Sequence, residues 1–151
     1  MPDFGALLNA PAGVAPKPKA LPMGNYPGVI RSHELVAAPE GKNYKTIIRF
    51  HVNLTGWADN VSDSDKSEPD GLGGTRPIDP TKRQLRRDFY DSQMFRLDDF
   101  IKSCGVVANG RTYAEVLPEL TGARVTCGVE PYISQKTGDE GNQINAIVGA
   151  S

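Results

Sequence analysis

Residues 45–54 alternate between apolar and polar side chains more regularly than any other part of the chain. Successive side chains of an extended chain point to opposite sides, so this pattern predicts a β-strand with one buried face. The apolar side consists of Ile48, Phe50, Val52 and Leu54. The fold is therefore expected to contain a sheet that packs one face against a core.

Four further segments have strand patterns, and one has the pattern of a helix. The strands are expected at 26–35, 82–90, 123–130 and 142–148. Between the third and fourth strands, apolar residues recur at helical spacing, at Leu97, Phe100, Ile101 and Cys104. Asp91 or Ser92 is the expected cap of this helix and Gly105 its end. Residues 111–117 are expected to form a second short helical turn, ended by Pro118.

This order of elements predicts an all-β protein with one or two short helices. Five strands with a helix between the third and the fourth are typical of the five-stranded barrel of the oligonucleotide-binding (OB) fold. Other small barrels and curved antiparallel sheets contain the same elements, so the order favours an OB-fold-like barrel without excluding them.

Composition divides the 151 residues into an arm and one domain. Residues 1–21 are rich in Pro and Ala and are expected to form a flexible N-terminal arm, and residues 22–151 are expected to form the OB-fold-like domain. Residues 56–81 are rich in Asp, Ser, Gly and Pro, which predicts a long, acidic and mobile loop. The sequence has no run of about 18 apolar residues, so no membrane span is expected.

The formal net charge of -1 conceals an uneven distribution of charge. Five acids and one base lie between Asp59 and Asp70, whereas six bases and three acids lie between Arg76 and Arg96. A local basic surface is therefore expected. Arg and Lys on such a surface can neutralise phosphates, and exposed aromatic rings beside them can stack on unpaired bases.

Nine residues are candidates for this surface. The expected phosphate contacts are Arg31, Lys45, Arg49, Arg83 and Arg86, and the expected stacking rings are Tyr26, Trp57, Tyr90 and Tyr132. Alternation along 82–90 places Arg87 on the inward side with Leu85 and Phe89, where it has to snorkel or lie at the rim of the barrel. Two structural alternatives stay open: the charged face of 45–54 can be a solvated strand face, and Trp57 can be a lid over the core.

Enzymatic and metal-dependent functions have little support in the sequence. His33, His51, Cys104 and Cys127 lack the paired spacing of a zinc site, and the glycine-rich segment 71–74 is not followed by Lys and Ser or Thr. The two cysteines are expected to be buried thiols. No catalytic residue, metal or cofactor is therefore expected.

Four short motifs lie in order along the chain: 21–26 (LPMGNY), 96–100 (RLDDF), 120–125 (LTGARV) and 142–145 (NQIN). Together they resemble small bacteriophage replication proteins that bind single-stranded DNA. The resemblance implies sequence-independent binding of single-stranded DNA in phage DNA replication or recombination, without chemistry. It also implies the cytoplasm of a bacterial host cell as the location and phage or host replication proteins as partners, with homo-oligomers left open.

A second hypothesis is a structural or assembly protein, such as a small virion or interaction barrel whose N-terminal arm crosses to a neighbour. Binding to oligo(dT) at low salt separates the two hypotheses, because only the first requires it.

Overall fold

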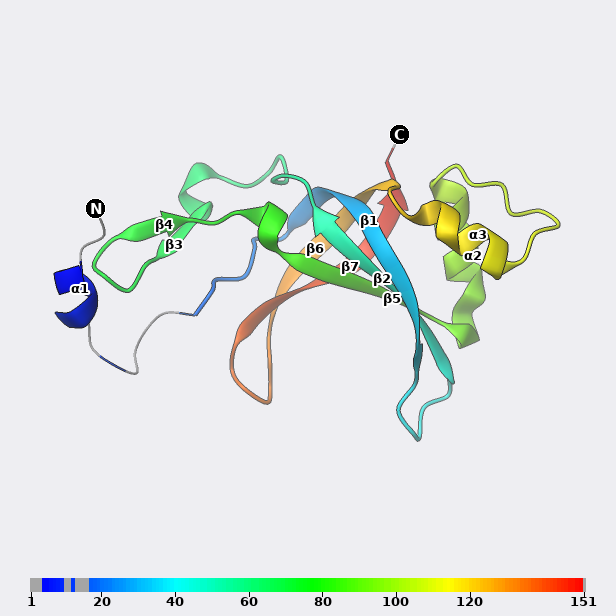
Figure 1. Cartoon of the computed structure of the whole chain (residues 1–151), viewed down its shortest axis with the longest axis horizontal. Coiled ribbons are helices and arrows are strands. Elements are labelled where there is room, and N and C mark those ends of the chain that lie inside the picture. The colour runs from blue at the N-terminus through cyan, green and yellow to red at the C-terminus, as the bar shows by residue number, and fades with distance from the viewer. Residues whose placement is uncertain (1–3, 10–11, 13–16, 151) are drawn as a thin grey trace.

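Five strands form one antiparallel sheet in the computed structural model, which describes residues 4–9, 12 and 17–150 (Figure 1). The order across the sheet is β5-β2-β1-β6-β7. The strands are β1 (Gly24–Ala37), β2 (Thr46–Leu54), β5 (Gln84–Tyr90), β6 (Arg124–Ile133) and β7 (Glu140–Gly149). The fold is therefore mostly β, and all five expected strands are confirmed with small changes at their ends.

The two edge strands of this sheet, β5 and β7, approach each other. Arg87 of β5 donates from Nη1 to the main-chain oxygen of Ile144 in β7, at 3.1 Å. This side chain therefore bridges the two strands. Among the described residues, no ladder of backbone hydrogen bonds joins β5 to β7. The sheet therefore curves until its edges are neighbours.

The alternation of the second strand is confirmed. Ile48, Phe50, Val52 and Leu54 are all buried, and Phe50 and Val52 are fully enclosed. Their neighbours Arg49, His51 and Asn53 are only half-buried and lie on the other face. The register with β5 places Arg87 opposite Phe50, on the inward side with Leu85 and Phe89, as the sequence predicts.

A β-bulge divides β1 into two parts. Residues 24–29 pair with β6, and from Gly28 onward the strand also pairs with β2. Ile30 is opposite Val52 and Ser32 is opposite the next residue, His51, so Arg31 is the extra residue. Beyond it β1 pairs with β2 alone, while β2 keeps its pairing with β5 on the other side, and the end of the β1–β2 hairpin points away from β6 and β7 (Figure 1).

The expected helix is α2 (Met94–Ser103), which lies between β5 and β6 in the chain. Leu97, Phe100 and Ile101 are buried, and Gly105 follows with a φ of 79°, which a glycine adopts without strain. The Phe100 ring lies 5.5 Å from both the Phe89 ring and the Phe50 ring. The apolar side of α2 therefore packs on the core, as its spacing predicts.

The expected cap of α2 is wrong. Asp91–Gln93 forms a 3-10 turn, and Gln93, the residue before the helix, makes no capping hydrogen bond with its side chain. The Asp91 carboxylate instead accepts hydrogen bonds from the backbone N–H groups of Lys45 and Thr46. It therefore fastens the start of β2 to the end of β5.

The second helical turn is present and continues past Pro118. It begins as α3 (Tyr113–Val116), where the Thr112 side chain accepts from the Glu115 N–H, and continues as a 3-10 helix, Leu117–Leu120. Pro118 occupies the start of that 3-10 helix, where its missing N–H costs nothing.

The expected structureless loop at 56–81 contains a hairpin. Its strands are β3 (Ser67–Pro69) and β4 (Thr75–Pro77), and 3-10 turns lie at Asp63–Asp65 and Pro80–Lys82. The Glu68 side chain is 7 % exposed and pairs with Arg76 across the hairpin, at 3.0 Å. Val61 and Ile78 are buried in the core. Long-range contacts therefore order a segment whose composition is that of a loop.

The prediction of a flexible arm is wrong for the last residues of that segment. Residues 1–3, 10–11 and 13–16 lie outside the described residues, and Phe4–Asn9 is a short helix, α1. Ala20 and Leu21 are buried, and Leu21 exchanges two hydrogen bonds with the Asn142 side chain of β7. Residues 19–21 therefore belong to the folded body.

Both cysteines are free thiols, as expected, but only Cys127 is fully buried, and Cys104 is half-buried. Burial raises the pKa of the Cys127 thiol to about 12. Within the described residues, no helix has the length and apolar character needed to cross a membrane.

Candidate functional site

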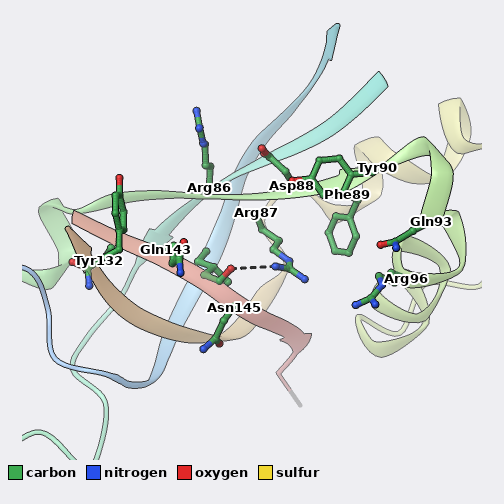
Figure 2. A pocket seen from close by; sticks show the side chains of 12 residues that line it. Arg86, Arg87, Asp88, Phe89, Tyr90, Gln93, Arg96, Tyr132, Gln143 and Asn145 are labelled. Atoms are coloured by element: carbon green, nitrogen blue, oxygen red, sulfur yellow. Dashed lines mark hydrogen bonds between the residues drawn. The ribbon is translucent and has the colours of Figure 1, made fainter. Parts of the chain in front are cut away.

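A hollow of about 550 Å³ lies where β5 and β7 approach each other (Figure 2). Its walls come from four elements that are distant in sequence: β5, the start of α2, the end of β6 and the first half of β7. The lining side chains are Arg86, Arg87, Asp88, Phe89, Tyr90, Gln93, Arg96, Tyr132, Asn142, Gln143, Ile144 and Asn145. We call this space the β5–β7 groove.

Arg87 lies between the two strands. Its register opposite Phe50 directs the side chain inward, and the guanidinium reaches the backbone of Ile144 (Figure 2). It also lies over the Phe89 ring, 5.4 Å from the ring centre. Its Nε is buried and has no hydrogen-bond partner. Burial lowers the pKa of the Arg87 guanidinium, which nevertheless remains a cation at any physiological pH.

Two further arginines line the groove, and both are exposed. The Arg86 side chain projects from β5 on the side opposite to Arg87, and Arg96 extends from α2 toward Arg87 (Figure 2). Among the described lining residues, Asp88 is the one carboxylate. It is already neutralised by Arg49, which donates to it through Nε at 2.9 Å and through Nη2 at 3.2 Å. The groove therefore has an excess of positive charge.

Tyr132 provides an exposed ring at one end of the groove. Its side chain is 46 % exposed and lies over Gly141, its neighbour across the β6–β7 ladder. A Cβ at residue 141 would meet two ring carbons and the hydroxyl oxygen of Tyr132 at 2.8–2.9 Å. The glycine therefore lets the ring lie close to the sheet.

At the other end of the groove, Tyr90 is half-buried against Tyr44, with 4.4 Å between the ring centres. The two rings are tilted by 44°. Tyr90 therefore offers the groove less free ring surface than Tyr132.

The structure brings three of the nine predicted site residues together in the groove: Arg86, Tyr90 and Tyr132. Two predicted cations have other partners. Arg49 is held by Asp88, and Arg83 donates to the main-chain oxygen of Lys19 at 2.8 Å. Both guanidinium groups therefore stabilise the fold, and a contact of either arginine with phosphate stays a prediction.

The expectation that Tyr26 is a stacking residue is corrected by its burial. Its ring is fully buried, and its hydroxyl donates to the main-chain oxygen of Pro22 at 2.7 Å. Burial raises the pKa of Tyr26 to about 12. A ring enclosed in this way has no face for a base.

Trp57, Arg31 and Lys45 lie outside the groove. Trp57 is half-buried against the core, 6.3 Å from the Tyr26 ring, with the Lys66 ammonium 5.8 Å from its own ring centre. This placement favours the lid over the stacking platform. Arg31 and Lys45 are exposed, on the bulge of β1 and beside the start of β2.

Sequence reasoning missed Arg87, Arg96, Gln143 and Asn145 as site residues. Alternation does place Arg87 on the inward side, which was a usable signal, since an inward arginine has to reach an edge of the sheet. The other three become site residues only because β7 and α2 meet β5, which no local pattern contains.

In the part of the chain that the structure describes, no group of His, Cys, Asp and Glu side chains is arranged to hold a metal ion. The chain matches no protein-family model, and a search of curated proteins finds no match.

Proposed function

We propose that this protein binds single-stranded DNA in the β5–β7 groove, without base pairing and without chemistry. The observation that carries the proposal is the set of Arg86, Arg87 and Arg96, which line one groove and have no carboxylate partner among the described residues. Arg87 is half-buried, and within the described residues its buried Nε has neither a hydrogen-bond partner nor a counter-charge. This partial burial is costly to the fold, and an anionic ligand would offset that cost.

The aromatic ring beside the arginines supports a single strand as the ligand. A nucleic-acid single strand exposes both phosphates and unstacked bases, and such strands are bound by cationic grooves with stacking rings. Tyr132 supplies such a ring at the edge of the groove. Bases of a duplex are already stacked and would leave the ring unused.

The strand order supports an OB-type barrel as the framework. In the expected barrel the third and fifth long strands are neighbours, and here these are β5 and β7, the two edges that Arg87 bridges. We include closure of the barrel along this seam in the proposal. In OB folds, strands and loops near such a face bind oligonucleotides.

The resemblance of the four sequence motifs sets the biological context of the proposal. It favours DNA replication or recombination of a phage or prophage, in the cytoplasm of a bacterial host, with replication enzymes as partners. The protein would keep displaced strands extended and unpaired.

The test is equilibrium binding of fluorescein-labelled (dT)12 to the full chain, followed by fluorescence anisotropy at several salt concentrations. Three phosphate contacts on a single strand give a slope of log K against log[salt] of about -2. Arg86→Ala combined with Arg96→Ala should weaken binding by about tenfold or more and bring the slope to about -0.7, because one contact remains.

The matched control is Arg31→Ala combined with Arg124→Ala, which removes the same charge from exposed positions outside the groove. This variant should keep most of the affinity and the slope. An equal loss in both double variants would show that net charge and not the groove drives binding. Absence of binding by the native protein at low salt would contradict the proposal altogether.

A further inference from the structure

A carboxylate lies beside the β5–β7 groove, on the exposed face of the β6–β7 ladder. Glu130 of β6 is opposite Gln143 of β7, and its two carboxylate oxygens accept from the side-chain amides of Gln143 and Asn145. Within the described residues Glu130 forms no ion pair, so its negative charge is not neutralised by the protein. The two amides fix its position.

Glu130 and Tyr132 belong to one surface. They are two residues apart on β6, so their side chains project from the same face of the sheet. Gln143 and Asn145, which hold Glu130, line the groove together with Tyr132 (Figure 2). Asn145 lies over Gly128, where any larger residue would displace it. A ring, a carboxylate and two amides therefore form one continuous surface at the β7 side of the groove.

An unpaired carboxylate repels phosphate, and this decides how a strand can lie in the groove. The arginines are on β5 and α2, on the other side of the groove from Glu130. The phosphates of a bound strand are favoured on the arginine side, which turns the bases toward Tyr132 and Glu130.

We propose that Glu130 contacts the base that stacks on Tyr132 and favours guanine over thymine at that position. Each carboxylate oxygen has two lone pairs, and the amides use one on each oxygen. The Watson–Crick edge of guanine presents two adjacent N–H donors, which match the two free lone pairs. Thymine presents a single N–H between two carbonyl oxygens, and the carboxylate repels both.

This inference rests on the proposed function, since it concerns one base of a strand bound in the same groove. Contacts to phosphate still give general affinity for any sequence. At one nucleotide position, a preference for guanine is added to this general affinity.

The experiment compares three labelled 12-mers on the native full chain at one salt concentration: (dT)12, (dTdG)6 and (dTdI)6. Inosine carries hypoxanthine, which is guanine without the 2-amino group. We expect (dTdG)6 to bind about tenfold more tightly than (dT)12, because a bidentate contact to one base discriminates by about five- to 150-fold. The affinity for (dTdI)6 should fall between the other two.

Glu130→Gln tests the role of the carboxylate. A carboxamide cannot accept two hydrogen bonds from guanine through two oxygens, so the ratio between (dTdG)6 and (dT)12 should fall to about one. The affinity for (dT)12 should rise, since a negative charge is removed. Glu115→Gln on α3, an exposed carboxylate outside the groove, should keep the ratio. Thermal unfolding establishes that both variants are folded.

Two outcomes would overturn the inference while leaving the proposed function intact. One is equal binding of the three oligonucleotides by the native chain. The other is a Glu130→Gln variant that binds all three more tightly by the same factor, which would reduce Glu130 to a general repulsive charge. If the native chain binds none of them at low salt, the proposed function fails as well.

Discussion

The Glu68 carboxylate connects two distant parts of the chain. It accepts from the backbone N–H of Lys19 at 2.7 Å and from Arg76 Nε at 3.0 Å. These two contacts, the first being the larger cause, hold the pKa of Glu68 below its usual value of 4.5. A composition-based prediction of a mobile loop could not include this contact, because one donor lies 49 residues away.

Glu68→Gln should lower the free energy of unfolding at pH 7 by about 2 kcal/mol, since hydrogen bonds to a charged group are lost. A carboxyl with a lowered folded-state pKa stabilises the fold above its unfolded pKa and loses that contribution as the pH falls through the folded value. The difference between native protein and variant should therefore shrink below pH 4.5. Urea unfolding at pH 7 and in mild acid measures it, and a constant difference would refute the ionic origin.

The nine candidate site residues show which part of a site local patterns can predict. Arg86 and Tyr132 line the groove as exposed side chains, because both alternate outward on a strand, whereas Tyr90 lines it half-buried against Tyr44. Tyr26 does not line the groove because its ring is fully buried, and Arg49 and Arg83 donate to groups on other segments of the chain. Exposure was predictable from the sequence, but competition from protein partners was not.

At the level of elements, α2 is fastened to the sheet by aromatic contacts. Phe100 lies nearly parallel to Phe89, at 18°, and meets Phe50 edge-on, at 69°. These three rings belong to β2, β5 and α2, and each element was predicted separately from the spacing of its apolar residues. The strands and α2 were predictable because period and burial agree along them.

Phe100→Ala should lower the free energy of unfolding by about 3 to 5 kcal/mol, because a large buried ring is replaced by a cavity. Phe95→Ala on the same helix is the matched control, since Phe95 is 61 % exposed, and it should change stability by less than about 0.5 kcal/mol. Urea unfolding followed by circular dichroism measures both. Equal effects would mean that α2 does not pack on the sheet through Phe100.

At the level of the whole molecule, residues 19–21 tie the hairpin region to β7. The backbone of Lys19 contacts Glu68 and Arg83, and the backbone of Leu21 contacts Asn142. This segment therefore lies beside the seam between β5 and β7 and reinforces it. The groove exists only because the edge strands β5 and β7 approach each other. Its β7 residues could therefore not be predicted from local sequence patterns.

A chain that starts at Pro22 should be less stable than one that starts at Lys17 by about 3 kcal/mol or more. The shorter chain loses the fully buried Leu21 side chain and the hydrogen bonds of Lys19 and Leu21. Both chains lack residues 1–16, so their difference isolates residues 17–21. Thermal and urea unfolding of the two chains provides the comparison. Equal stability would show that the segment does not support the seam.

The bulge in β1 has a consequence for how the sequence can change over evolution. When a residue is deleted from inside a regular strand, every later side chain of that strand moves to the opposite face of the sheet. Arg31 is the exception within β1, since Ile30 and Ser32 already pair with consecutive residues of β2. A lineage could lose the codon at this position and keep the pairs between β1 and β2 in register, changing only the local bend of β1.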